Sequence, residues 1–223
     1  MKKIIIPLTC LFLLSLTFAM AAVKDLEIQG KKLVSQKPPF TMALPSEFRL
    51  IHSFSHENPK ENSLTRAYLY IKEKKNQVEE LLIVQIADRT NPQAGPITVP
   101  LLKPYTEKRM YLKDKKKRGG LEVDYMIQLM AWNPDASPLQ HIVKMGINIL
   151  SLWALQGQFM FIYKGEHAAF IRYSKDVNSF GLKVSGEGND WNKDSISRNE
   201  KRVYETFQKT FMQMMDSIHI QNP

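Results

Sequence analysis

The stretch SPLQHIVKMGINILSLWALQGQFMFIYKGEHAAFIRY, Ser137 to Tyr173, is the most apolar part of the chain beyond its N-terminal segment. It begins with Ser137 and Pro138, a capping hydroxyl followed by a proline at the first helical position. Gly157 offers a stop further along. Between these signals, apolar residues recur at helical spacing, namely Ile142, Met145, Ile149, Leu152 and Trp153. The pattern predicts a helix that begins at Ser137 and ends near Gly157.

Two short β-type runs follow the predicted helix. They are Phe159 to Tyr163 and His167 to Tyr173, and the turn sequence Lys164-Gly165-Glu166 lies between them. We expect a hairpin here. A helix beside a hairpin favours a two-layer α+β core, but neither element indicates a reaction.

The N-terminus has the three parts of a secretory signal. Lys2 and Lys3 provide the positive start, Ile4 to Phe18 is apolar, and Ala19-Met20-Ala21 is a small-residue cleavage site. The sequence therefore predicts that residues 1–21 are removed and that residues 22–223 form one exported domain, periplasmic or extracellular. An uncleaved membrane anchor is the alternative.

Loss of the signal would also remove Cys10, the only cysteine. Disulfides, thiol catalysis and cysteine metal sites would then be excluded, and we expect no cofactor. The formal net charge of +9 would fall to +7 without Lys2 and Lys3. The remaining positive charge is clustered, so its position matters more than its total.

Several alternating or apolar runs predict the strands of a sheet. One run, Glu80 to Ala87, is apolar on both faces, which is typical of a central strand covered on both sides. The other predicted strands are Leu26 to Val34, the run that begins at Phe48, Arg66 to Lys72, and Leu121 to Trp132.

A C-terminal helix is the clearest element in the sequence. Ser197 and Glu200 form a capping box, a serine with a glutamate three residues later. An apolar stripe at helical spacing follows and consists of Val203, Phe207, Phe211, Met214 and Ile218. This stripe is expected to dock on the sheet.

Taken together, FTMALPSEFRL near the mature start, the run of strands and the closing helix FQKTFMQMMDSIHI resemble the PsbP-like family of exported proteins. The resemblance implies an α+β fold, a mostly antiparallel sheet covered by helices in a sandwich. It also implies an accessory or binding role, with no shared catalytic motif. The insertion at 89–120 departs from the family's pattern.

That insertion is expected to be a proline- and lysine-rich loop. Prolines recur every four residues at its start, and the cluster Lys113, Lys115, Lys116, Lys117 and Arg118 lies near its end. Such a cluster suits an anionic ligand, an acidic partner or lipid headgroups, and a solvated loop is the alternative. Export and the absence of aromatic residues within the cluster disfavour nucleic acid.

Other candidate sites have simpler structural interpretations. His52 and His56 share a face on a strand or a helix, but no third ligand for a metal lies nearby in the sequence. Met212, Met214 and Met215 suit core packing better than copper binding. Glu122 and Asp124 share the polar face of a strand, where solvation is the simpler interpretation.

The sequence therefore predicts a non-enzymatic binding or accessory protein of the cell envelope, with an unidentified envelope protein or anionic ligand as its partner. Two alternatives remain. One is an envelope hydrolase whose site forms only in three dimensions. The other is a membrane-surface protein that makes peripheral contact through the basic cluster.

Overall fold

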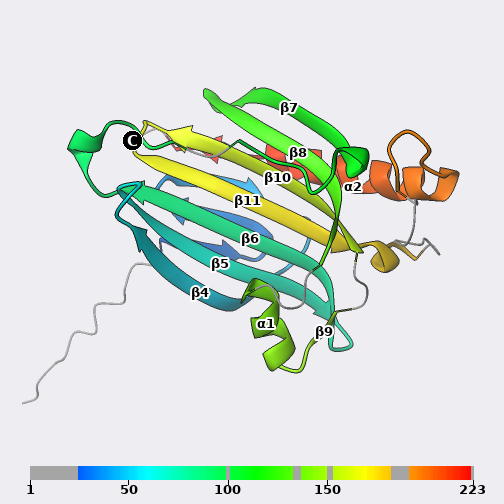
Figure 1. Cartoon of the computed structure of the whole chain (residues 1–223). Helices are drawn as coiled ribbons and strands as arrows, with labels where there is room; N and C mark the ends of the chain where they lie inside the picture. The colour runs from blue at the N-terminus through cyan, green and yellow to red at the C-terminus, as the bar shows by residue number, and fades with distance from the viewer. Residues whose placement is uncertain (1–24, 99–100, 133–136, 150–152, 182–190, 222–223) are drawn as a thin grey trace, which may run out of the picture.

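A large antiparallel sheet forms the centre of the protein in a computed structural model, which describes residues 25–98, 101–132, 137–149, 153–181 and 191–221 (Figure 1). The strand order is β4-β5-β6-β11-β10-β8-β7, and the short β9 runs parallel to the start of β6. These strands are β4 (Arg49–Asn58), β5 (Ser63–Lys74), β6 (Gln77–Arg89), β7 (Met110–Arg118), β8 (Leu121–Ala131), β9 (Asn148–Ile149), β10 (Trp153–Tyr163) and β11 (His167–Asp176).

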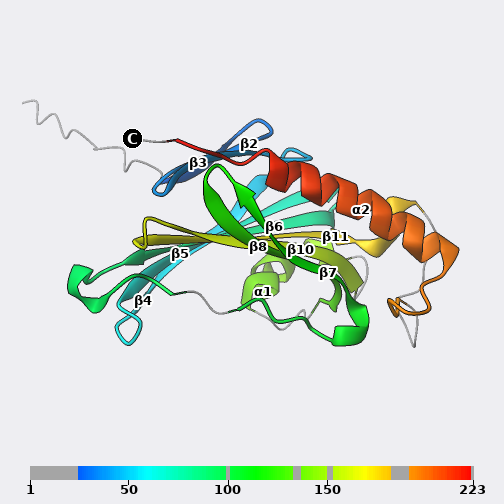
Figure 2. The same cartoon turned by 90° about the horizontal axis from the view of Figure 1, so that it is seen from above.

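One face of this sheet is covered jointly by a long helix and a second, smaller sheet (Figure 2). The small sheet has the order β1-β2-β3-β12. Its strands are β1 (Leu26–Gln29), β2 (Lys32–Gln36), β3 (Pro39–Ala43) and β12 (His219–Ile220). The helices are α1 (Ser137–Lys144) and α2 (Arg198–Asp216), with 3-10 turns η1 (Pro92–Ala94), η2 (Glu107–Arg109) and η3 (Val177–Phe180).

Helix α2 begins with the expected capping box. The Ser197 hydroxyl accepts a hydrogen bond from the Glu200 backbone N–H, and the Glu200 carboxylate accepts one from the Ser197 backbone N–H at 2.8 Å. All five residues of the predicted apolar stripe are buried. Within the described ranges, neither helix has both the length and the hydrophobicity needed to cross a membrane.

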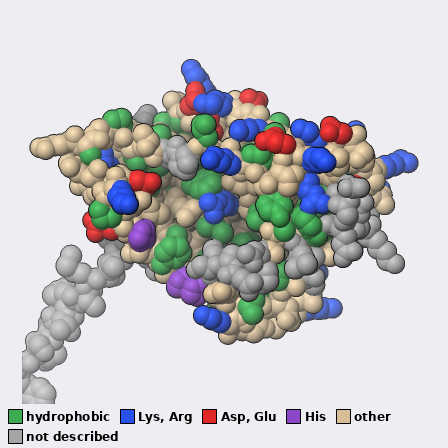
Figure 3. Space-filling model, in the orientation of Figure 1, with side chains coloured by type: hydrophobic (Ala, Val, Ile, Leu, Met, Phe, Trp, Pro, Cys, Tyr) green, Lys and Arg blue, Asp and Glu red, His purple; other side chains and the backbone are tan. Residues whose placement is uncertain are grey.

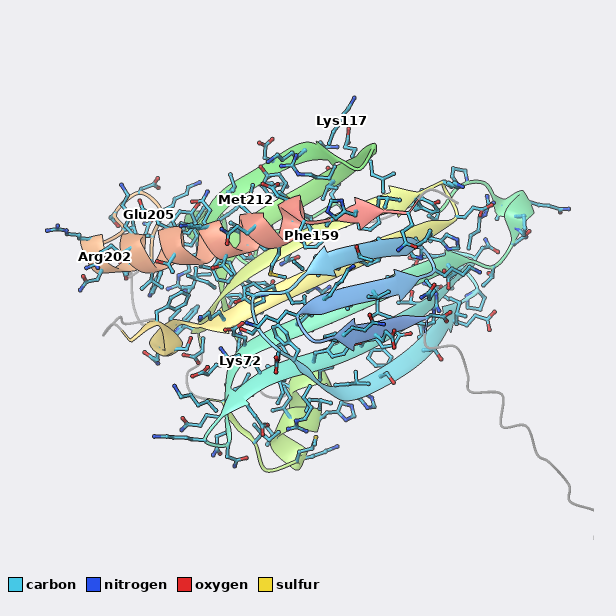
Figure 4. All side chains as sticks on the ribbon, turned by 180° about the vertical axis from the view of Figure 1, so that it is seen from behind. Lys72, Lys117, Phe159, Arg202, Glu205 and Met212 are labelled. Carbon is cyan, nitrogen blue, oxygen red and sulfur yellow. The ribbon has the colours of Figure 1, made fainter. Side chains whose placement is uncertain are left out.

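Aromatic contacts join α2 to the large sheet and form the main core. Phe207 stacks on Tyr173 with centroids 5.4 Å apart, and Phe211 lies 5.9 Å from Phe159. Figure 4 labels Phe159 beneath the helix. Gly157 of β10 lies directly under Phe211, and a Cβ at this position would overlap the phenylalanine ring. Gly157 therefore allows the helix to approach the sheet closely, whereas the sequence suggested that it ended a helix.

The expected helix-covered α+β sandwich is wrong, because the described chain is mostly β and has two α-helices. The predicted helix from Ser137 to Gly157 ends at Lys144, and β10 begins at Trp153. Residues 154–161 of β10 are buried on both faces of the sheet. A strand of this kind is apolar on both sides, so its pattern imitates that of a buried helix.

The strand predictions agree better with the structure. The hairpin at Lys164-Gly165 is present as β10 and β11, and both turn residues have positive φ angles of 52° and 69°. The run from Leu26 to Val34, predicted as one strand, divides into β1 and β2 around Gly30. The expected loop at 89–120 includes η1, η2 and strand β7.

Candidate functional site

The face of the large sheet that points away from α2 is partly covered by two segments and also carries a hollow. Helix α1 covers one end, where Leu139 and Ile142 pack against Leu69 and Ile71 of β5. Of the segment 97–105, the described residues 97–98 and 101–105 cover the other end, and Leu102 packs with side chains of β8 and β10. Figure 3 looks onto this face and shows hydrophobic and basic side chains exposed above α1.

The main part of the hollow is a cavity of about 470 Å³, a volume within the usual range of small-molecule sites. Apolar side chains form much of its lining: Ile97, Leu101 and Leu102 come from the covering segment, and Met160 and Phe170 come from β10 and β11. Gln85, Gln158 and Arg172 contribute polar groups. Glu61 and Arg172 lie at opposite ends of the cavity. Glu61 precedes the first residue of β5, whereas Arg172 lies level with Leu69, in the middle of that strand.

Arg172 places a guanidinium in this largely apolar hollow. It lies on β11 between Ile83 of β6 and Gln158 of β10. Its Cζ is 4.3 Å from the centroid of the Phe170 ring. The side chain is partly buried, and this burial lowers the pKa of the guanidinium from its ordinary value, although arginine remains charged in proteins. Among the described residues, no carboxylate forms an ion pair with Arg172.

A chain of buried glutamines crosses the sheet beside Arg172. The side-chain oxygen of Gln156 accepts hydrogen bonds from the amides of Gln128, at 3.3 Å, and Gln158. The Gln156 amide donates to the Ser174 hydroxyl at 3.1 Å. The side-chain oxygen of Gln128 accepts a bond of 2.6 Å from the Tyr105 backbone N–H. This chain fixes one end of the covering segment to the sheet and holds Gln158 at the cavity wall.

Two further cavities adjoin the main one. The smaller, about 40 Å³, is lined by His52, Phe54 and Tyr68, and it shares Gln85 and Arg172 with the main cavity. The larger, about 430 Å³, shares Leu101 and Leu102 and extends to the residues of β7. Arg172 therefore lies where the main and the smaller cavities meet.

The predicted basic cluster lies on β7, an edge strand of the large sheet, and not in a loop. Lys113 and Lys115 line the larger neighbouring cavity. Lys117 points away from the protein near the end of β7 (Figure 4). Charged side chains on an edge strand hinder pairing with other chains, so this placement also has a structural role.

Part of the cluster is neutralised by carboxylates. Lys115 lies 2.7 Å from Glu122 and 3.2 Å from Asp124, and its hydrogen bond to Glu122 is the main reason that the lysine pKa is raised. Lys116 and Arg118 both pair with Asp216 at the end of α2. Glu122 and Asp124 are thus partners of a lysine, and Met214 and Met215 are buried in the core.

The two histidines of β4 have different surroundings. His56 is exposed, whereas the ring of His52 stacks on that of His141 in α1 with centroids 3.7 Å apart. Partial burial, followed by the nearby His52 and Lys144, lowers the pKa of His141. Within the described ranges, no group of three or more His, Cys, Asp or Glu residues has the geometry of a metal site.

A buried carboxylate lies on the α2 side of the large sheet, apart from the hollow. Glu80 is 2% exposed and accepts a hydrogen bond of 2.9 Å from the Tyr173 hydroxyl. Lys72 and Lys175 lie 3.1 and 3.4 Å from it. Burial by itself would raise the pKa of this carboxyl, but the two lysines and Tyr173 hold it below its usual value. Because its partners already satisfy it, Glu80 fits a structural role.

The residues that define the hollow were not recognised in the sequence. Gln156 lay inside the predicted helix, Gln158 lay just after it, and Arg172 lay inside a predicted hairpin strand. Polar residues at alternate positions of otherwise apolar strands were the available signal. The sequence alone does not show whether such a face is covered.

Comparisons with protein-family models, curated proteins and solved structures found no match for this chain. The resemblance to the PsbP-like family therefore stays a prediction. The functional evidence is the geometry itself, a largely apolar cavity that contains a guanidinium with no carboxylate partner among the described residues.

Proposed function

We propose that this protein is a non-enzymatic binding protein of the cell envelope whose cavity holds an anionic, amphipathic ligand. The observation that carries the proposal is Arg172. A partly buried charge without a counter-ion is costly in an apolar setting, and an anionic ligand would supply that counter-ion.

The surroundings of Arg172 define the ligand's chemistry. A guanidinium offers several N–H donors in one plane, which match the two oxygens of a carboxylate or a phosphate. The cavity wall beyond it is apolar through Phe170, Met160 and Leu102. A ligand with an oxyanion head and a hydrocarbon tail satisfies both parts of the site.

Calorimetric titration with dodecanoate, dodecyl phosphate and dodecanol tests this proposal. The two anions should bind more tightly than the alcohol, since hydrogen bonds to charged groups are worth about 1.5–3 kcal/mol, or roughly 10- to 150-fold in affinity. Arg172→Met should remove this preference and leave dodecanol binding nearly unchanged. Arg202→Met, an exposed position on α2 (Figure 4), is the matched control. Equal binding of anion and alcohol by the wild type, or no binding, would reject the proposal.

The proposed location depends on the N-terminal signal. N-terminal sequencing of protein from the envelope fraction should find a chain that begins after Ala21 or Ala22. Retention of residues 1–21 in that fraction would mean an anchored protein instead.

A further inference from the structure

Both segments that cover this face of the large sheet expose large apolar side chains. In the segment 97–105, Leu101 is 73% exposed and Tyr105 is 58% exposed. At the end of α1, Val143 and Met145 are each about half exposed. Isolated exposed hydrophobic residues are ordinary, but these four occur on the two segments that pack on the same face of the large sheet.

The two elements lie on the same side of the molecule. Figure 2 shows α1 and the described residues between η1 and η2 on the side of the large sheet opposite α2 and the small sheet. A flat surface that approaches this side would meet both elements together. The main cavity opens on this same side of the large sheet, and Leu101 and Lys103 line it, so its ligand would pass beside the surface that meets the membrane.

The charge of these elements has one sign. The sequence contains no Asp or Glu from Arg89 to Thr106, nor from Ser137 to Ile149. Lys103 and Lys144 are exposed and have no carboxylate partner among the described residues. Each lysine is close in sequence to an exposed apolar residue. This combination suits the headgroup region of an anionic bilayer, where lysines stay at the polar level and apolar tips insert.

We infer that Leu101, Lys103, Tyr105, Val143, Lys144 and Met145, here called the rim surface, dock the protein on an anionic membrane, from which the cavity takes its ligand. The second half of this statement rests on the proposed function, whereas the docking itself does not. The basic cluster of β7 adds positive charge at the far end of the adjoining cavity but is not the docking element.

Co-sedimentation with vesicles tests the docking. Protein recovered after export, with its N-terminus verified, is mixed with vesicles of phosphatidylcholine alone or with added phosphatidylglycerol. The wild type should bind the mixed vesicles and bind less as salt rises above about 0.1 M. The triple variant Leu101→Ser, Val143→Ser, Met145→Ser should bind at least about tenfold less, since the apolar contribution is lost. The replaced side chains are about half exposed or more, so the variant should fold normally.

Charge variants and a cavity variant separate the two proposals. Lys103→Ser with Lys144→Ser should remove the preference for phosphatidylglycerol, whereas Lys201→Ser with Lys209→Ser on α2 should not. Arg172→Met should bind vesicles as the wild type does. A variant with only Val143→Ser and Met145→Ser, two positions that do not line the main cavity, should still bind dodecanoate from solution. No binding by the wild type, or equal binding by the rim variant, would overturn the docking. A wild-type dimer that the rim variant abolishes would likewise overturn it and assign the surface to a second copy.

Discussion

The imidazole rings of His52 and His141 stack with their centroids 3.7 Å apart and an angle of 19° between their planes. This contact links the edge strand β4 to helix α1, and His52 also lines the small cavity beside Arg172. Two neutral rings stack readily, whereas two protonated rings repel each other.

We expect acid to weaken this contact. Burial, His52 and Lys144 lower the pKa of His141 in the folded protein, so protons bind the unfolded state more tightly. The stability that neutral His141 contributes is therefore fully present above the pKa of about 6.5 that histidine has in the unfolded chain. This contribution is lost as the pH falls from there through the lower pKa of His141 in the folded protein.

Urea unfolding at about pH 7.5 and about pH 5.5, on either side of that pKa, checks this expectation. His141→Gln should reduce the loss of stability between the two conditions. The control is His56→Gln, at an exposed position on β4, the strand of His52, and it should leave the loss unchanged. An identical pH dependence in His141→Gln and the wild type would contradict the expectation.

Gly157→Ala should destabilise the protein. The added methyl group would overlap the ring of Phe211, which is fully buried between α2 and the sheet. Overpacking of this kind costs about 1–3 kcal/mol. Urea unfolding measures the loss, and adding Phe211→Leu should recover part of it. If Gly157→Ala alone unfolds with the wild-type midpoint, the close approach of α2 is not as described.

Glu80→Gln should also reduce stability, because it leaves Lys72 and Lys175 without their shared buried carboxylate. Removing one member of a buried charge cluster costs about 3–5 kcal/mol of unfolding free energy, and a glutamine that keeps hydrogen bonds should cost less.

The loss should also depend on pH. Since the pKa of Glu80 is lowered in the folded protein, the stability that its carboxylate contributes is present above the unfolded pKa of about 4.3 and is lost as the pH falls further. The variant should thus show less acid destabilisation than the wild type. Glu205→Gln, on the exposed side of α2, should show the full acid effect.

Replacing Lys115, Lys116 and Lys117 by serine should change stability little. Lys115 and Lys116 form ion pairs with partly or fully exposed partners, and such pairs contribute about 0–1 kcal/mol each. Thermal unfolding should therefore shift by only a few degrees. Vesicle binding should weaken less than in the rim-surface variant, and the opposite order would identify β7 as the docking element.

The sequence predicted the elements whose patterns are local. Helix α2 was predictable because Ser197, Glu200 and the spacing from Val203 to Ile218 all agree. Strand β10 was not, because apolar residues on both faces give the same pattern as a buried helix. Arg172 was missed for another reason. Its surroundings come from Phe170 on its own strand and from Leu102, about seventy residues earlier, so no window of sequence contains the site.

The small sheet joins the two ends of the described chain, since β12 at residues 219–220 pairs with β3 at residues 39–43. The Gln221 backbone N–H also donates a hydrogen bond to the Pro39 carbonyl at 3.0 Å. Strand β3 therefore gains this neighbour only after residues 219–220 have been synthesised. Pairings so distant in sequence form late and slow the acquisition of the native state. Until residues 219–220 are available, one edge of β3 has no strand beside it, so the small sheet cannot be completed by its N-terminal strands alone.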